Sequence, residues 1–192
     1  MAMSHNVVII SAHPDDMEIG MGGTAAKLAE SMAVITSVVV TNGGRSSNPF
    51  ALTEQRIVEV RREEAIRAAG VLGVKDVILC GEPDAAEEIN TAAVKRRLVE
   101  ILARLRPTEV YTLDEELDRH PAHRLACKLA RESVLEAGIV LSGGIWAYEI
   151  WAPSLPGTAL STLTAMWPRR WLPSRCIKVR WQRYPMGKES WD

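Results

Sequence analysis

Two short segments of the sequence combine histidines with carboxylates at spacings that suit a metal ion. Residues 11–18 read SAHPDDME, and residues 118–123 read DRHPAH. Zinc prefers imidazole nitrogen and carboxylate oxygen as ligands, and a catalytic zinc site combines three protein ligands with a water. Either segment alone is more often a capped turn than a metal site. Together they predict a metal site, provided that the fold brings them to one place.

The elements around these segments predict such a fold. Continuous β-branched runs such as Val7 to Ile10 indicate strands that are covered on both faces. Thr53 and Asn90 stand where they can cap two of the expected helices. The expected strands are 7–10, 33–41, 77–80, 110–113 and 145–151, and the expected helices are 22–31, 53–72, 91–105 and 121–137. Strands that alternate with helices predict an α/β fold, a Rossmann-like three-layer sandwich with a mostly parallel sheet.

Three loops of this fold are expected to meet. In open α/β sheets the chemistry sits beyond the carboxyl ends of the strands. The loops that follow predicted strands there are 11–24, 41–50 and 113–123. If the last predicted helix begins near Pro121, His123 lies in its first turn and His120 just before it. The two imidazoles can then face one cavity and perform different tasks.

Several of these residues together resemble a known family. Segment 12–16, followed by Gly22-Gly23-Thr24, resembles the signature of the PIG-L-like (LmbE-like) zinc-dependent N-acetylglucosamine deacetylases. Segment 120–123 resembles the second histidine motif of that family. Supporting segments are 61–65 with 72–74, and Pro83-Asp84. The resemblance covers about residues 5–151 in a consistent order.

The resemblance implies a hydrolase that removes the N-acetyl group from an N-acetylglucosamine-type substrate. The zinc ligands that it implies are His13, Asp16 and His123. Asp15 would act as the general base that takes a proton from zinc-bound water, and His120 would stabilise the oxyanion of the tetrahedral intermediate. Zinc lowers the pKa of bound water from about 16 to about 7. A site of nitrogen and oxygen donors can also hold Fe²⁺ or Co²⁺ in place of zinc.

The same resemblance implies substrate-binding residues, and the chain differs from the family motif at one position. Arg61 and Asp84 are candidates for holding a sugar hydroxyl. The expected partners are a small-molecule amino-sugar substrate and further copies of the chain, because the family is often oligomeric. The second motif of the family commonly reads His-Pro-Asp-His, whereas Ala122 replaces the aspartate here. A supporting hydrogen bond to a histidine is therefore expected to be missing.

Two other functions fit parts of the sequence. Residues 20–25 read GMGGTA, which matches the G-x-G-x-x-A pattern of dinucleotide-binding Rossmann domains. That pattern should begin directly after the strand, whereas Gly20 lies well beyond Ser11. A noncatalytic sugar-binding protein on the same scaffold also remains open, because the residues that bind a sugar do not by themselves show turnover.

The composition excludes several other classes. The chain has 192 residues, a formal net charge of −1 and 47% hydrophobic residues, so no overall basic field points to nucleic acid. No apolar run approaches the roughly 20 residues that span a bilayer. The first residues lack the basic and apolar parts of a signal peptide, which predicts a cytoplasmic protein. Cys80, Cys127 and Cys176 are far apart, so neither disulfides nor a thiolate metal site are expected.

The last part of the sequence differs from the rest. We expect one domain over residues 1–192, with an atypical tail at 157–192 that crowds tryptophan, arginine and proline. Codons can be chosen for this tail so that a shifted reading frame yields segments typical of the family. A frame-shifted tail, an ordinary divergent tail and a tryptophan-rich binding segment are the three explanations. The coding DNA distinguishes the first from the others, because an early stop in the shifted frame excludes it.

Overall fold

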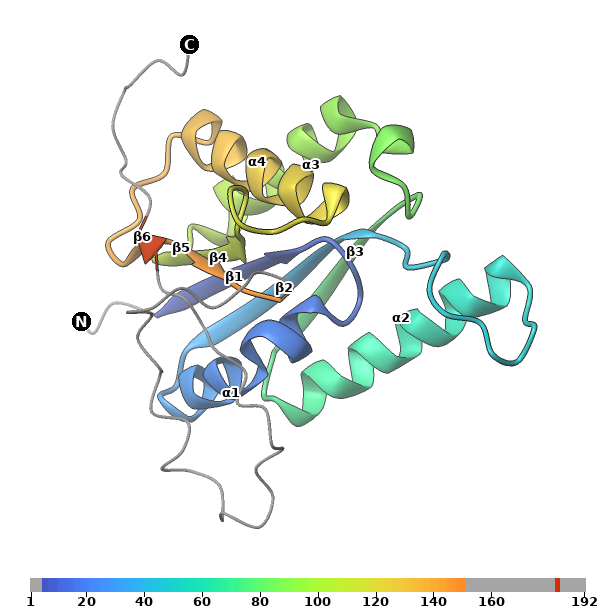
Figure 1. The fold of residues 1–192 in the computed structure, drawn as a ribbon. Coiled ribbons are helices and arrows are strands. Elements are labelled where there is room, and N and C mark those ends of the chain that lie inside the picture. The colour runs from blue at the N-terminus through green and yellow to red at the C-terminus, as the bar shows by residue number, and fades with distance from the viewer. Residues whose placement is uncertain (1–4, 151–181, 184–192) are drawn as a thin grey trace.

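The strands that the structure describes form one mixed sheet that is parallel except at one edge. The structure is a computed structural model, and it describes residues 5–150 and 182–183. The parallel strands are β1 (Asn6–Ser11), β2 (Val34–Thr41), β3 (Asp76–Glu82), β4 (Glu109–Leu113) and β5 (Gly144–Tyr148). A short β6 (Gln182–Arg183) pairs antiparallel with β5, and the order is β3-β2-β1-β4-β5-β6 (Figure 1). The predicted α/β class with a mostly parallel sheet is confirmed.

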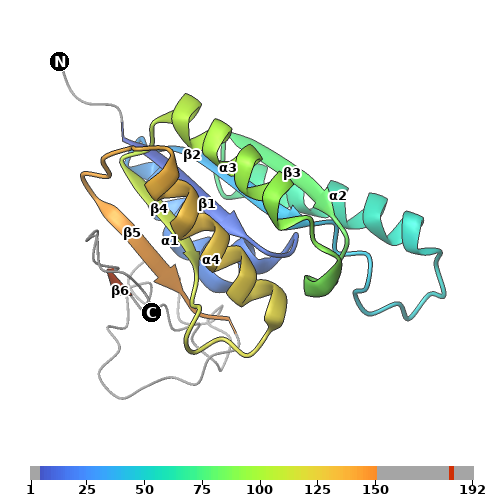
Figure 2. The ribbon, with the colours of Figure 1, turned by 90° about the horizontal axis from the view of Figure 1, so that it is seen from above.

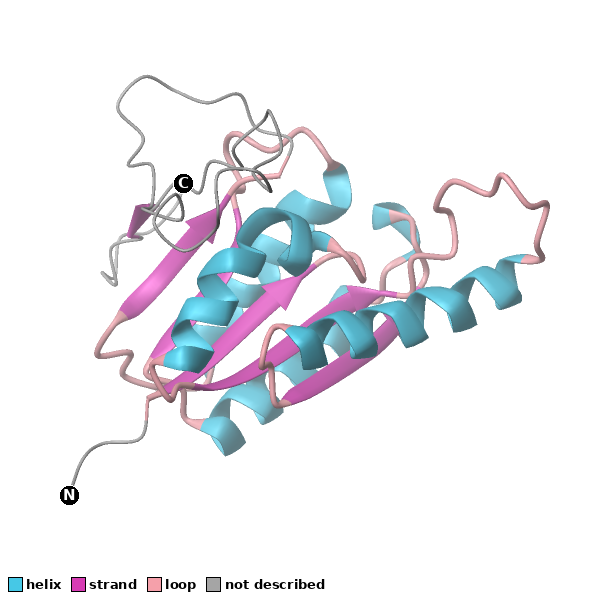
Figure 3. Ribbon diagram, turned by 90° about the horizontal axis from the view of Figure 1, so that it is seen from below, coloured by secondary structure: helices cyan, strands magenta, loops and turns pink. Residues whose placement is uncertain are grey.

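Helices cover both faces of this sheet. Helices α1 (Asp16–Glu30) and α2 (Glu54–Val71) lie on one face, and α3 (Thr91–Leu105) and α4 (Pro121–Glu136) on the other (Figures 1 and 2). The view from below shows helices lying in front of the sheet on this face (Figure 3). A short 3₁₀ turn, η1 (Ala86–Glu88), precedes α3. The molecule therefore has the three layers that the sequence predicts.

The local sequence explains why these elements form. Val7, Val8, Ile9 and Ile10 are at most 1% exposed, because helices cover both faces of β1. The Thr53 side chain accepts a hydrogen bond from the backbone of Arg56 at the start of α2, and Asn90 caps α3 through Ala93 in the same way. The buried residues of α3 recur at helical spacing and are Val94, Leu98, Ile101 and Leu102.

The strand order creates a crevice at one edge of the sheet. β1 pairs with β2 on one side and with β4 on the other, so the chain winds away from β1 in both directions. A doubly wound sheet has its ligand-binding crevice at such a point, beyond the carboxyl ends of the strands. The loop after β1 (residues 12–15) and the loop after β4 (residues 114–120) both open there.

The predicted start of the first helix is wrong. We expected a helix over 22–31 that begins at a glycine turn, whereas α1 begins at Asp16 and continues through Gly20 and Gly22, with non-helical dihedrals at Met21. Glycine weakens a helix interior, but tertiary packing outweighs propensity here. A Cβ on Gly20 would lie 2.4 Å from Cδ2 of Tyr148, so only glycine allows α1 and β5 to approach this closely.

The predictions for the tail fall almost entirely outside the described residues. Of residues 157–192, only Gln182 and Arg183 are described, through their backbone pairing with β5. Among the described residues, no helix has the length and the apolar character needed to cross a membrane.

Candidate metal centre

The loop after β1 places a buried carboxylate at the start of α1. Oδ2 of Asp16 accepts hydrogen bonds from the backbone N–H groups of Ala12 (2.9 Å) and His13 (2.7 Å). These two bonds fix the carboxylate, and the residue is only 3% exposed. The second oxygen, Oδ1, faces the imidazoles of His13 and His123. Backbone geometry alone therefore orients this acid toward the histidines.

The loop after β4 positions the second histidine motif. Pro121 is the first residue of α4, where its fixed φ angle favours the helix and its missing N–H costs nothing. His120 consequently occupies the N-cap position and is exposed, whereas His123 lies in the first turn and is 1% exposed. The structure thus places His123 in the first turn of the helix and His120 just before it, as predicted.

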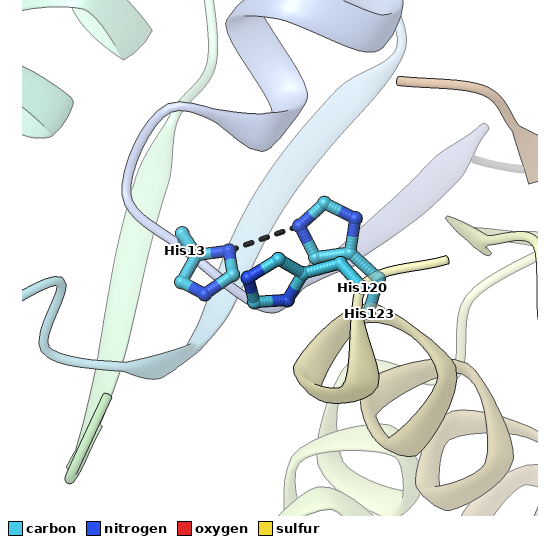
Figure 4. A group of neighbouring side chains, drawn as sticks. All are labelled: His13, His120 and His123. Carbon is cyan, nitrogen blue, oxygen red and sulfur yellow. Dashed lines mark hydrogen bonds between the residues drawn. The ribbon is translucent and has the colours of Figure 1, made fainter. Parts of the chain in front are cut away.

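Three donor atoms, from the loop after β1 and from the first turns of α1 and α4, lie close together. Nδ1 of His13 lies 3.0 Å from Nε2 of His123 (Figure 4), and Oδ1 of Asp16 lies 3.5 Å from the first nitrogen and 3.3 Å from the second. Zinc bonds of 2.0–2.1 Å in a tetrahedral arrangement separate neighbouring ligand atoms by about 3.3 Å. The spacing and the nitrogen and oxygen chemistry of this set fit a zinc ion with one position open.

A second possible set of metal ligands includes His120 in place of Asp16. Ring nitrogens of His13, His120 and His123 lie within 4.8 Å of one another, and the three rings surround one space (Figure 4). The set that contains Asp16 is tighter and more buried, since no pair of its donor atoms is more than 3.5 Å apart. We therefore take His120 as a neighbour of the centre and not as one of its ligands.

The imidazoles of His13 and His123 each place their second ring nitrogen next to a carboxylate. Nε2 of His13 lies 3.0 Å from Oδ1 of Asp84, and Nδ1 of His123 lies 2.8 Å from Oδ2 of Asp118. A ring nitrogen that donates its proton to a carboxylate leaves the opposite nitrogen with a free lone pair. In a metal-bound form, each of these lone pairs would face the ion beside the Asp16 carboxylate, and metal binding would displace a proton from each imidazole.

The surrounding carboxylates favour positive charge at this point. Burial alone would lower the pKa of His13, but the hydrogen bonds and charges of Asp16 and Asp84 outweigh it and raise the pKa to about 9. Burial is likewise outweighed at His123, where Asp118 and Asp16 raise the pKa to about 9. Burial opposes the charge of Asp16, yet the two histidines hold its pKa below the usual range. The same field attracts a metal cation.

The electrostatics of His120 differ from those of the other two histidines. Partial burial and the positive charges of His123 and His13 lower its pKa. A neutral imidazole still carries one N–H donor. His120 can therefore donate a hydrogen bond at the rim of the centre in its neutral form, without a positive charge.

Asp15 is the more exposed of the two adjacent aspartates. It occupies the N-cap position of α1 but makes no capping bond through its side chain, which is 41% exposed. Its Oδ1 lies 2.7 Å from Nη2 of Arg61, which comes from α2. Nε of Arg61 is buried and has no hydrogen-bond partner among the described residues. Arg61 lines the same cavity as Asp15, so this ion pair stands at the edge of the candidate site.

All seven residues predicted from the sequence line one cavity of about 310 Å³, a volume suited to a small molecule. They are His13, Asp15, Asp16, Arg61, Asp84, His120 and His123. The loop after β2 adds Gly43, Arg45 and Ser46, and Ile19 and Ile150 add apolar surface. Gly43 has a φ of +67° and a Cβ there would lie 2.9 Å from Cδ of Pro14, so glycine lets the two loops touch.

Sequence reasoning missed the part played by Asp118. This residue stands two positions before His120 in the second motif, and that position was its only signal. Its contact with His123 depends on the turn of loop 114–120, in which Oδ1 of Asp114 accepts the N–H groups of Glu116 and Leu117. Residue spacing does not reveal such a turn.

The dinucleotide-binding alternative finds no support in the glycine segment. Residues 20–25 lie inside α1, where backbone N–H groups bond within the helix and do not form an open loop for phosphates. The start of α1 faces the donor cluster instead, through Asp15 and Asp16.

The chain matches a known protein family over most of its described residues. The family model described as PIG-L, GlcNAc-PI de-N-acetylase, matches residues 8–134. Diacetylchitobiose deacetylase of Thermococcus kodakarensis is 33% identical over 135 residues, which are 69% of this chain and 50% of that protein. The chain thus spans about half the length of this relative.

Two solved structures are similar in fold and sequence. N,N'-diacetylchitobiose deacetylase from Pyrococcus horikoshii is 29% identical with a TM-score of 0.68, over 79% of this chain and 63% of that one. The 4-carboxy-2-hydroxymuconate hydratase from Pseudomonas putida KT2440 is 26% identical with a TM-score of 0.72, over 86% of this chain and 75% of that one. With the family match over most of the described residues, these likenesses show that the chain belongs to the PIG-L family.

Proposed function

We propose that the chain is a metal-dependent N-deacetylase that removes the acetyl group from an N-acetylglucosamine-type substrate. The observation that carries this proposal is the convergence of Nδ1 of His13, Oδ1 of Asp16 and Nε2 of His123 within 3.5 Å of one another. The names of the similar deacetylases support the reaction and the class of substrate.

The nitrogen and oxygen donors favour a divalent transition metal. His13, Asp16 and His123 would hold zinc, with Fe²⁺ or Co²⁺ as substitutes. When bound, such an ion supplies Lewis acidity and makes water a nucleophile near neutral pH. The chain's own residues must then place the acetamide, move one proton twice and stabilise one developing negative charge.

Asp15 is the group that moves the proton. Its carboxylate faces the cavity and is held by Arg61 at 2.7 Å. As water adds to the carbonyl carbon of the acetamide, Asp15 accepts a proton from it. The C–N bond then breaks, and the same proton passes from Asp15 to the departing nitrogen. The products of this step are acetic acid and a primary amine. The acid then gives its proton to the amine, so acetate and an ammonium leave and atoms and charges balance.

His120 is the donor for the developing oxyanion. It lies at the exposed rim beside His13 and His123, with ring centroids 4.8 and 4.6 Å away. Its N–H can bond to the carbonyl oxygen as negative charge builds there. Removal of a donor of this kind costs about 2.7–4 kcal/mol of transition-state stabilisation.

Arg61 and Asp84 are proposed to hold the sugar. Both line the cavity beside the donor cluster, and hydroxyl groups can bond to a guanidinium and a carboxylate at once. Oδ1 of Asp84 contacts His13 and Oδ2 accepts the N–H of Arg45 at 3.1 Å, which leaves further lone pairs for a hydroxyl. The apolar Ile19 and Ile150 can pack on the ring.

The test is primary-amine release from a panel of N-acetylglucosamine derivatives, with protein stripped of metal and protein reloaded with zinc. We expect release that requires zinc and disappears in Asp15→Ala. If zinc binds at one ion per chain and an acetamido sugar binds but releases no amine, the result favours a noncatalytic sugar-binding protein on this scaffold. Absence of zinc binding would refute the metal centre itself.

The likeness to a hydratase favours a second candidate reaction. That relative spans 86% of this chain, a larger share than the 79% spanned by the deacetylase structure. The cavity carries Arg45 and Arg61, and guanidinium groups can bind carboxylates. Loss of ultraviolet absorbance from an unsaturated polycarboxylic acid, without amine release from any acetamido sugar, would favour addition of water to a C=C bond.

A further inference from the structure

Loop 114–120 contains a buried aspartate that neither the motif nor the proposed reaction uses. The side chain of Asp118 is 0% exposed, although it carries a carboxylate. Burying a carboxylate is costly unless hydrogen bonds compensate for the lost water. Its contacts therefore indicate its task.

Asp118 contacts both histidines of the second motif. Oδ2 lies 2.8 Å from Nδ1 of His123, and Oδ1 accepts the backbone N–H of His120 at 2.8 Å. One carboxylate thus fixes the ring of the inner histidine and the backbone of the outer one. Both oxygens are engaged, and neither is directed at the cavity, which Asp118 does not line.

The first of these contacts determines which nitrogen of His123 carries the proton. A carboxylate beside Nδ1 favours the tautomer with hydrogen on that atom. Nε2 then presents its lone pair, and it lies 3.0 Å from Nδ1 of His13 and 3.3 Å from Oδ1 of Asp16. The opposite tautomer would place a hydrogen among the donor atoms and block coordination.

The sequence explains why this contact matters in this chain. Ala122 lies between the two histidines of the motif and is 2% exposed. Its methyl group accepts no hydrogen bond. Asp118 supplies a carboxylate to the motif from outside it, from the loop before α4.

We propose that Asp118 is the positioning residue of the metal centre, holding His123 in the ligating tautomer and tying His120 to it through the backbone. This inference rests on the proposed function only in taking the donor cluster as a metal site. Partners that orient a metal-bound histidine typically change metal affinity by about 10- to 100-fold.

The experiment compares zinc affinity in three proteins by competition with a chromophoric chelator. Asp118→Asn keeps the shape but turns an amide N–H₂ or a weaker acceptor toward Nδ1. Asp114→Asn is the matched control, because the amide Oδ1 of asparagine can still accept the two backbone N–H groups that hold the turn of this loop. We expect zinc affinity to fall about 10- to 100-fold in Asp118→Asn and to stay near wild type in the control.

Equal losses in the two variants would assign the effect to loop damage and overturn the proposal. If Asp118→Asn does not fold, long-range ¹H–¹⁵N NMR of the zinc-loaded wild type decides the question. The expected spectrum shows His123 protonated at Nδ1 and bound through Nε2, and binding through Nδ1 would refute the role. A wild type that binds zinc but releases no amine would refute the proposed function and leave this comparison intact.

Discussion

Arg61 joins two parts of the cavity that are distant in the sequence. It pairs with Asp15 at 2.7 Å, and its Nε is buried without a hydrogen-bond partner among the described residues. Hydrogen bonds to charged groups contribute about 1.5–3 kcal/mol. We therefore expect Arg61→Ala to lower kcat/KM about 10- to 100-fold by both misplacing Asp15 and weakening substrate binding.

Steady-state kinetics with zinc-loaded protein would measure this loss, and zinc content should stay at the wild-type level because Arg61 contacts no proposed ligand. Arg61→Lys serves as the matched variant, since it keeps the charge but loses the planar fork. Unchanged kinetics in Arg61→Ala would show that neither the ion pair nor a sugar contact contributes to the reaction.

At the residue level, the sequence predicts the chemistry of a side chain well. It predicts the contacts of that side chain less well. His13, Asp16 and His123 have ligand chemistry, and the structure places their donor atoms together. The pairing of Asp84 with His13 and of Asp118 with His123 was not predicted. Both contacts arise in loops after strands, where backbone dihedrals, and not residue type, decide the direction of a side chain.

At the level of elements, α1 depends on one close approach. A Cβ at Gly20 would lie 2.4 Å from Cδ2 and 2.8 Å from Cε2 of Tyr148, whereas a Cβ at Gly70 in α2 would meet nothing within 4 Å. Overpacking of this kind costs about 1–3 kcal/mol. Gly20→Ala should therefore lower the free energy of unfolding by that amount.

Urea denaturation gives both values, with Gly70→Ala as the control. Alanine is about 0.5–1 kcal/mol better than glycine in a helix interior, so the control should be neutral or slightly more stable. Because α1 begins at the metal-site residue Asp16, Gly20→Ala should also weaken zinc binding. Equal stability of the two variants would mean that α1 can shift freely on β5.

The elements that propensity and pattern determine were predicted closely. The predicted helix over 91–105 matches α3, because Asn90 caps it and its apolar residues repeat at helical spacing. The start of α1 was misplaced because its glycines have low helix propensity, and the close approach to β5 that requires Gly20 cannot be read from the local sequence. Tertiary contacts of this type carry no local signal.

At the level of the whole molecule, metal binding should appear as thermal stability. An ion that binds only the folded chain stabilises it by about 2.7 kcal/mol at a free concentration one hundred times its Kd. For a domain of this size that corresponds to a rise in Tm of about 5–10 °C. We expect zinc to produce this rise in the wild type and not in His123→Ala.

His5→Ala is the control for nonspecific binding to imidazole. His5 precedes β1 at the opposite end of the strand from the donor cluster and contacts Glu109 at 3.6 Å. This variant should keep the full shift in Tm in scanning calorimetry. A shift that survives in His123→Ala but is lost in His5→Ala would place the metal elsewhere in the chain.

The two imidazoles that meet at 3.0 Å are 110 positions apart in the sequence. Strands β2, β3 and β4 lie between them along the chain. An ion that both imidazoles hold would act as a removable cross-link around this stretch. If the folded chain were pulled by its ends, the force would reach β2 and β3 only after coordination broke. Rupture force measured with and without zinc would then report directly on the strength of the metal centre.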